Sequence, residues 1–350
     1  MTMSRYGFPL IISLLLSTAS ATAQTADLKA PRKMSRWDVP AANYSGITRI
    51  ADGQFAVIDD KSPDAGFYML GVSIDRKSGK IKEVSCSPLF CDSLTAGSQA
   101  DAKADIEDIA YIASSQTFYL VSEAHQTIEE YDAQGRKTGR ALHVPDIFAS
   151  SVIVHNGGFE SLAYDSLRHS LWTTTECPLP LDGGDSVDIL RLQSFDVLTG
   201  EPNGTWLYAM DSRRYKSARF NARGVSAITV CPDGSLLVLE RELRVPRHYA
   251  GSKCTVRIYR VTPNEGNSLS PTCFGSSTEG CTPLEKTPVA SFTTRLGIFG
   301  GRYANYEGMC FGPTLSDGSR TLILIADSQQ GAGNFLYRLR DYLRVIRLKK

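Results

Sequence analysis

The chain has 350 residues, with 38 Lys or Arg against 37 Asp or Glu, which gives a formal net charge of +1. A near-neutral chain argues against nucleic acid as a partner and gives no support for bulk attraction to anionic membranes. We expect a monomer that acts on a small molecule.

The first 23 residues have the organisation of a secretory signal. Arg5 makes the start positive, residues 8–16 are apolar, and Ala21-Thr22-Ala23 is a small-residue cleavage site. The apolar stretch is too short to span a bilayer, and no later run is long enough. We predict cleavage before Gln24 and a secreted or periplasmic protein in which residues 24–350 form one domain. Loss of Arg5 leaves 37 basic and 37 acidic residues.

Five segments along the chain share one pattern. Each opens with an apolar residue, then Glu or Ser, then a small or acidic residue, then an apolar one. A polar turn and a second apolar run follow, and that run ends in an acid. The segments open at Tyr44, Ile106, Phe159, Val225 and Tyr306, and their closing acids are Asp59-Asp60, Glu123, Glu176, Glu240 and Asp327.

The spacing within each copy predicts a β-hairpin. From the opening Glu or Ser to the closing acid the chain runs 14, 16, 16, 14 and 20 residues. Two strands of about five to six residues and a turn fill that length. An antiparallel hairpin places the start of its first strand beside the end of its second. Each copy therefore brings its Glu or Ser and its closing acid to one end of the sheet, and a radial arrangement makes these pairs converge on an acidic ring.

The spacing between copies predicts the fold class. The opening Glu or Ser positions are 62, 53, 66 and 81 residues apart, which are blade-plus-loop lengths. We predict an all-β chain that forms a single β-propeller with six blades, five of them recognisable and the sixth degenerate within residues 261–305. A β-sandwich is the alternative, but it does not explain the repeated acid positions.

All eight cysteines follow the signal segment, an even number in an oxidising compartment. Cys86/Cys91 and Cys273/Cys281 are close enough in sequence for local disulfide staples. The remaining four, which allow two longer bridges, are Cys177, Cys231, Cys254 and Cys310. Their pairing cannot be deduced from spacing.

Short motifs in the repeats resemble a known family of secreted phytase-like propellers, known as "esterase-like activity of phytase". The matching segments are Asn43-Tyr44-Ser45-Gly46, Asp105-Ile106-Glu107-Asp108-Ile109, Gly157-Gly158-Phe159-Glu160-Ser161-Leu162-Ala163, Asn305-Tyr306-Glu307-Gly308 and Ile325-Ala326-Asp327-Ser328. The resemblance extends from about Trp37 to Leu339. It implies a calcium-dependent propeller that acts on phosphoesters or other esters.

The acidic ring is the candidate site. Carboxylates that face one channel raise one another's pKa and require cations, and hard oxygen ligands in a roomy site favour Ca²⁺. The residues we expect to bind calcium are Asp60, Glu107, Glu123, Glu160, Glu176, Glu240, Glu307 and Asp327. Glu107 or Glu160 is our candidate general base, and His125 is a further acid/base candidate. Basic residues beside the ring, which can bind phosphate oxygens, are Lys61, Arg223, Arg241 and Arg302.

Three other interpretations stay open. The repeated Glu residues can instead bind backbone amides of the neighbouring blade, with Arg or Lys neutralising them. A non-catalytic propeller, stabilised by calcium, can bind a carbohydrate, a peptide or a surface partner. A lactonase-like propeller uses one central metal held by a few acids and an Asn, and the ring is richer in carboxylates than that requires. No G-x-S-x-G elbow or Walker A motif occurs.

Overall fold

The structure is a computed structural model that describes residues 26–62, 64–91, 105–215, 218–269, 278, 281–297, 302–332 and 338–349. The segment with signal-type composition and Cys273 lie outside these residues. Helical structure in the described ranges is limited to short 3-10 turns: η1 (Met34–Trp37), η3 (Asp146–Phe148), η4 (Pro180–Asp182), η5 (Gly184–Ser186) and η6 (Glu265–Asn267).

Antiparallel strands form five sheets, which we number as blades in chain order. The first blade is β3 (Tyr44–Ala51), β4 (Gln54–Asp59), β5 (Gly66–Ile74) and β6 (Ile81–Cys91), and the second is β7 (Ile106–Ile112), β8 (Thr117–Ser122), β9 (Thr127–Tyr131) and β10 (Lys137–Ala141). The third is β11 (Phe159–Asp165), β12 (Ser170–Thr175), β13 (Ile189–Asp196) and β14 (Pro202–Ala209). The fourth is β15 (Phe220–Val230), β16 (Leu236–Val245), β17 (Lys253–Val261) and β18 (Thr287–Arg295), and the fifth is β19 (Asn305–Phe311), β20 (Arg320–Asp327), β21 (Tyr342–Leu348), β1 (Ala26–Leu28) and β2 (Arg32–Lys33).

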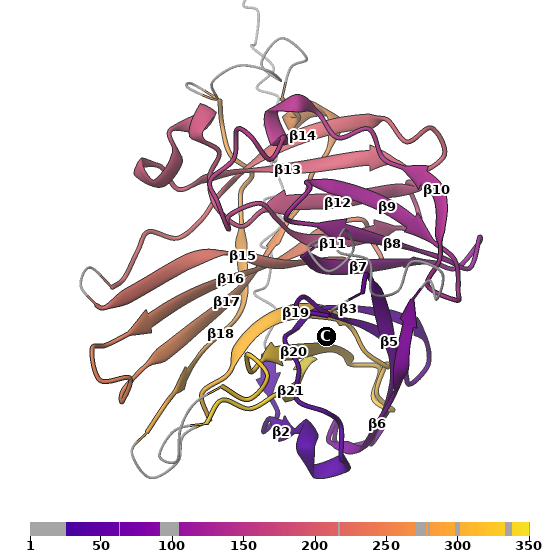
Figure 1. The fold of residues 1–350 in the computed structure, drawn as a ribbon, viewed down its shortest axis with the longest axis vertical. Coiled ribbons are helices and arrows are strands. Elements are labelled where there is room, and N and C mark those ends of the chain that lie inside the picture. The colour runs from indigo at the N-terminus through magenta and orange to yellow at the C-terminus, as the bar shows by residue number, and fades with distance from the viewer. Residues whose placement is uncertain are drawn as a thin grey trace, which may run out of the picture.

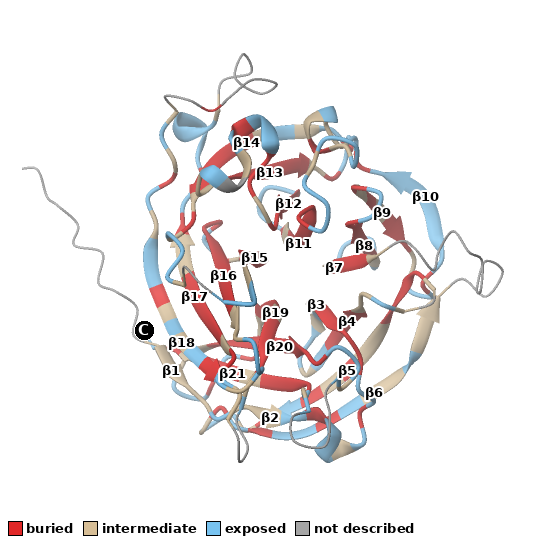
Figure 2. Ribbon diagram, turned by 60° about the vertical axis from the view of Figure 1, so that its left-hand side comes forward, coloured by how far each residue is buried: buried red, intermediate tan, exposed pale blue. Residues whose placement is uncertain are grey.

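The sheets surround a common axis, with the first strand of each hairpin innermost (Figure 2). These inner strands contact one another in the cyclic order β3, β7, β11, β15, β19 and back to β3. The arrangement is a β-propeller, so the predicted class is confirmed and the sandwich alternative is wrong. Each predicted repeat is the inner hairpin of one blade.

The two ends of the described chain close the ring. β1 and β2 both pair antiparallel with β21, with Ala26 opposite Leu348 and Arg32 opposite Leu343. The indigo and yellow ends of the chain therefore lie side by side in the fifth blade (Figure 1). Pairing between segments more than 300 residues apart removes the free edge that an open ring would leave.

The hydrophobic core is divided among the blade interfaces. Five buried clusters each contain residues of two neighbouring blades. One joins Ile47 and Val57 of the first blade to Ile323 and Val345 of the fifth. Because a blade packs against a neighbour on both faces, its middle strands are apolar on both sides, as in the fully buried run at residues 236–239.

The predicted number of blades was wrong: there are five sheets, not six. The region expected to hide a degenerate blade supplies β18, which pairs with β17 as the outer strand of the fourth blade. Among the described residues between 262 and 304, β18 is the only strand. One strand and a long connection extend an existing sheet and do not build a new one.

The predicted Cys86–Cys91 staple is also wrong. Both residues lie on β6, five positions apart, so an extended strand separates their Cα atoms by about 16 Å. A disulfide needs Cα atoms within roughly 7 Å. No disulfide is seen among the described cysteines. Within the described ranges, no helix is long and apolar enough to cross a membrane.

Candidate active site at the channel mouth

A β-bulge marks the start of every inner hairpin. In the second blade, Ile106 pairs with Ser122 and Asp108 with Val121, so Glu107 is the extra residue. Equivalent register shifts occur in the other blades, at Ser45-Gly46, Glu160, Ser226 and Glu307. A bulge bends its strand and redirects a side chain. The repeated Glu or Ser of the sequence pattern is thus the bulged residue of each blade.

The second strand of each hairpin places another side chain at the same end. This side chain belongs to the residue directly after the one that pairs with the first apolar residue of the copy. In the third blade, Phe159 pairs with Thr175, and Glu176 comes next. The equivalent positions in chain order are Asp60, Glu123, Glu176, Arg241 and Asp327. Four blades therefore contribute an acid here, and the fourth contributes an arginine.

These residues surround a cavity of about 460 Å³ at the mouth of the channel. Its charged lining contains seven carboxylates and two cations: Asp60, Glu107, Glu123, Glu160, Glu176, Glu307, Asp327, Lys61 and Arg241. Amide side chains add neutral oxygens to the wall, from Asn43, Asn156, Asn305, Gln329 and Gln330. The cavity therefore has five more carboxylates than cations.

Arg241 is the main internal counter-ion. Its guanidinium is 2.8 Å from Glu176 Oε1, forms an ion pair with Glu307, and donates a hydrogen bond of 3.1 Å to Asn305 Oδ1. Glu160 is further away, at 3.9 Å. Gly224 permits this arrangement, because a Cβ there would lie 2.2 Å from Glu176 Cγ. Close approach of β15 to Glu176 thus requires a residue without a side chain.

Burial and mutual repulsion raise the pKa of the channel acids. Burial, followed by the charges of Glu160 and Asp60, raises the pKa of Glu107 well above its ordinary value. Burial raises the pKa of Glu307 to about 7, although Arg241 acts in the opposite direction. Burial and the nearby Glu307 raise the pKa of Asp327 to about 9. One arginine is too little positive charge for this many buried carboxylates.

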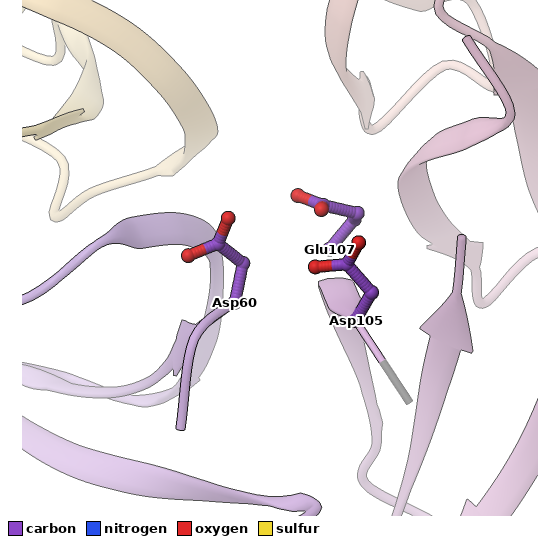
Figure 3. A group of neighbouring side chains, drawn as sticks. All are labelled: Asp60, Asp105 and Glu107. Carbon is purple, nitrogen blue, oxygen red and sulfur yellow. The ribbon is translucent and has the colours of Figure 1, made fainter. Parts of the chain in front are cut away.

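The acids of the first and second blades meet most closely. In Figure 3 the carboxylates of Asp60, Asp105 and Glu107 point toward one another, and one oxygen of each lies within 4.8 Å of the other two. Asp60 Oδ1 is buried and has no hydrogen-bond partner. Lys61 Nζ lies 2.8 Å from Asp60 and 2.6 Å from Asp105, but its side chain is 53% exposed. These three carboxylates form the densest group of oxygen ligands found among the described residues.

At several positions the residues of the repeat bind the backbone of the neighbouring blade, as the alternative interpretation expects. Ser45 and Ser226 donate hydrogen bonds to the carbonyls of Ile106 and Tyr306, the opening residues of the next inner strands. Glu123 Oε1 accepts a hydrogen bond of 2.9 Å from the Gly158 amide. The repeat therefore has a structural use in some blades and leaves carboxylates open to the cavity in others.

Four predicted site residues are not brought to the cavity. Glu240 lies one position before Arg241 and points into the interface between the third and fourth blades, where Tyr208 of β14 and Lys286 bind it. Arg223 binds Asp188 and the Asp211 carbonyl. His125 and Arg302 are exposed and do not line the cavity. The other predicted calcium and phosphate ligands all line it.

The misplacement of Glu240 has a simple cause. The sequence pattern aligned acid with acid, but the register aligns Glu240 with Asp59 and Arg241 with Asp60. A one-residue shift on a strand moves a side chain to the opposite face. Sequence reasoning also missed Asp105 as a site residue, although it directly precedes the Ile106-Glu107 motif. Asp105 has a left-handed backbone (φ 47°), which is uncommon for a residue other than glycine.

The chain belongs to the phytase-like family: the family model "Phytase-like: Esterase-like activity of phytase" matches residues 39–329. No curated protein matches the chain. Among solved structures, an endo-arabinase from Bacteroides thetaiotaomicron is similar at 12% identity, covering 91% of this chain and 96% of that one, with a TM-score of 0.46.

Two further solved structures are similar over most of the chain. A periplasmic gluconolactonase from Pseudomonas aeruginosa has 12% identity, with 88% of this chain and 74% of that one covered and a TM-score of 0.33. An α-L-arabinofuranosidase from Podospora anserina has 12% identity, 94% and 97% coverage and a TM-score of 0.41. All three TM-scores are below 0.5, so these likenesses carry no argument about function.

Proposed function

We propose that this member of the phytase-like family is an exported, calcium-dependent hydrolase of phosphomonoesters or related esters. The observation that supports the proposal is the channel-mouth cavity, in which seven carboxylates face only two cations. A phosphate group carries further negative charge and would be repelled by this surface unless cations were bound first. Export is proposed from the composition of residues 1–23.

The cavity residues fit calcium. Ca²⁺ takes about six to eight oxygen ligands at roughly 2.3–2.6 Å, from carboxylates, amides and water. Asp60, Asp105 and Glu107 offer closely spaced oxygens, and Asp60 Oδ1 is buried without a hydrogen-bond partner. Asn43 adds an amide oxygen to the wall of the cavity that Asp60 and Glu107 line. Lys61 forms ion pairs with Asp60 and Asp105, but its exposed side chain can turn into solvent when a cation binds.

The proposed reaction is hydrolysis by water. Bound calcium would neutralise phosphate oxygens and make water a better nucleophile. The water oxygen forms the new bond to phosphorus, the ester P–O bond breaks, and the departing alcohol oxygen takes up a proton. The water proton passes to an ionised carboxylate of the cavity, which acts as the general base. Glu160 is the better candidate than Glu107, because it is outside the Asp60–Asp105–Glu107 group.

Phosphate release from residues 24–350 tests the proposal. We expect release from phytate and from 4-nitrophenyl phosphate with Ca²⁺, and none with a chelator. Glu107→Gln and Glu160→Gln should each abolish release while the protein stays folded. Glu201→Gln is the matched control, because Glu201 is an exposed acid that contacts His143 on the surface. Release that is unaffected by the chelator, or by both cavity variants, would exclude the mechanism.

One observation favours a second candidate, a calcium-stabilised propeller without catalysis. Both terminal guanidinium nitrogens of Arg241, the buried cation of the cavity, are taken up by Glu176, Glu307 and Asn305, which leaves only the buried Nε without a hydrogen-bond partner. In this case Ca²⁺ raises the melting temperature but no ester is hydrolysed. A lactonase-like use of the site remains a further alternative, supported by the Asn side chains in its wall. It would be detected as lactone hydrolysis with no phosphate release.

A further inference from the structure

A second cavity, of about 290 Å³, adjoins the acidic one. Most of its side chains are apolar or aromatic: Phe220, Leu243, Val245, Tyr249, Leu296, Tyr303 and Leu339. Phe220 and Tyr249 are 55% and 50% exposed and are the two aromatic residues among the large exposed hydrophobic side chains of the described residues. We call this the aromatic cavity.

The aromatic cavity is built by an extension that distinguishes the fourth blade. β15 and β16 have 11 and 10 residues, whereas β7 and β8 of the second blade have 7 and 6. The extra length lies on the mouth side of the bulge, where Phe220 pairs with Val245 and Ala222 with Leu243. These long strands reach away from the other blades at the left of Figure 1. Their mouth-side ends form a wall beside the channel.

The turn that closes this wall holds Tyr249 in an unusual conformation. Tyr249 has φ 61°, a left-handed backbone that bulky residues rarely adopt. Ser252 fixes the turn by donating hydrogen bonds from its amide and its hydroxyl to the Tyr249 carbonyl. Arg219 holds the ring, with its guanidinium 5.2 Å from the ring centroid and one nitrogen 3.0 Å from the hydroxyl. Backbone strain of this kind is retained where the surrounding structure enforces it, often at ligand sites.

The two cavities share a wall. Residues that line both are Phe220, Leu243, Asn305, Asp327 and Gln329. Asn305 stands at this border and donates a hydrogen bond of 2.7 Å to Glu307. One molecule can therefore place a polar group among the acids and an apolar group against Phe220 and Tyr249. The volume of 290 Å³ is nearly twice the roughly 150 Å³ cavity that holds benzene, which is enough for one or two fused rings.

We infer that the aromatic cavity binds an aromatic ring attached to the ester whose phosphate lies at the acidic cavity. The preferred substrate class is then an aryl phosphomonoester, ahead of a polyol that carries phosphates alone. Ring-to-ring contacts with Phe220, Tyr249 and Tyr303 recognise such a group, because aromatic pairs interact beyond their buried area. This inference rests on the proposed function and specifies the substrate of the same site.

Kinetics with two substrates test the inference in the full-length mature protein. Phe220→Ala and Tyr249→Ala should each raise KM for 1-naphthyl phosphate about tenfold, the effect of losing one apolar contact surface. KM for glycerol phosphate, which has no ring, should change less than twofold. Both rings are half exposed, so these variants are expected to fold. Leu198→Ala is the matched control, because Leu198 is a 74% exposed apolar residue remote from the cavity lining. Equal changes for both substrates, or no change for either, would overturn the inference.

Calorimetric binding separates this inference from the proposed hydrolysis. With Ca²⁺ present, 1-naphthyl phosphate should bind at least tenfold more tightly than inorganic phosphate or 1-naphthol, and Phe220→Ala should remove most of that advantage. This result supports the shared site even if no phosphate is released. Absence of phosphate release would contradict the proposed hydrolysis alone. If 1-naphthyl phosphate binds no more tightly than inorganic phosphate, the aromatic cavity does not take part and the inference is wrong.

Discussion

The channel mouth and the interface between the third and fourth blades both bury acidic side chains, but these acids have different partners. At this interface, Glu240 accepts hydrogen bonds of 2.7 Å from Tyr208 of the third blade and from Lys286. Arg257 lies 3.0 Å from Glu242. In the cavity, Asp60 Oδ1 has no partner and a single arginine serves several acids.

The pKa shifts reflect this difference. Burial disfavours ionisation of Asp211, on the connection between the third and fourth blades, but hydrogen bonds from Lys286 and Tyr259 outweigh it and lower the pKa of Asp211. At the mouth, burial prevails and the pKa of Asp327 rises to about 9. Buried acids with built-in cations are part of the structure. Buried acids without them are where an external cation has most to contribute.

Loss of an acid from the cluster between the third and fourth blades should have the largest effect. Glu240→Gln leaves Lys286 and Arg257 short of a buried partner, so we expect the free energy of unfolding to fall by about 3–5 kcal/mol. The loss should be the same with and without Ca²⁺. Urea unfolding measures it, with Glu201→Gln as the exposed control. A loss below about 1 kcal/mol would show that this cluster does not depend on its internal pairing.

Calcium should have the next largest effect, and only through the channel mouth. At a concentration 100 times Kd, binding to the folded state adds about 2.7 kcal/mol to the free energy of unfolding. We expect this gain in the wild type and in Glu201→Gln, and its loss in Glu107→Gln and Asp60→Asn. Thermal unfolding with Ca²⁺ and with a chelator measures the difference. A gain that survives in both cavity variants would place the cation elsewhere.

The metal-free protein should become less stable as the pH rises. Glu307 and Asp327 have folded-state pKa values of about 7 and about 9, above ordinary values of 4.5 and 3.8. Between the ordinary and the raised values the folded state holds more protons than the unfolded state, so stability present at low pH is lost as each group ionises. We expect a loss on the order of 2 kcal/mol between pH 7.5 and pH 9.5, most of it from Asp327.

Urea unfolding in the presence of a chelator at several pH values tests this slope. Asp327→Asn should remove its upper part, and saturating Ca²⁺ should reduce it, because the cation favours the ionised carboxylates. Stability that is constant or increasing over this range would mean that Arg241 already compensates for the cavity acids.

The smallest effect should come from Lys61. Its side chain is 53% exposed, so Lys61→Ala should change the free energy of unfolding by less than about 1 kcal/mol. The substitution frees the Asp60 and Asp105 carboxylates and removes a positive charge that repels Ca²⁺. We therefore expect Ca²⁺ to bind about fivefold more tightly. Calcium titration by calorimetry measures this. Weaker binding would mean that Lys61 organises the group instead of competing for it.

Much of the fold could be predicted from local pattern. The alternation of apolar and polar residues, the turns and the five repeated openings gave every inner hairpin and the propeller class. The blade count could not be obtained in this way. A strand pattern near residue 290 does not show whether the strand starts a new blade, and only its pairing with β17 assigns β18 to the fourth blade.

The candidate site was predicted in outline and corrected in detail. Residue type and spacing placed Glu107, Glu160 and Asp327 at one end of the propeller, where the structure brings them together. Their roles as calcium ligands or base stay predictions. The exchange of Glu240 for Arg241 could not be predicted, because both positions end the same apolar run and only the pairing register decides which one faces the channel.

The sequence by itself determined the inner hairpins, the family and the concentration of acids at one end of each hairpin, since these depend on contacts between residues near in the chain. Only the tertiary structure decided that five blades close through β1, β2 and β21, that bulges direct the repeated Glu residues inward, and that Phe220 and Tyr249 stand beside the acids. Those features depend on pairing and packing between distant segments, and short-range pattern carries no information about which distant segments meet.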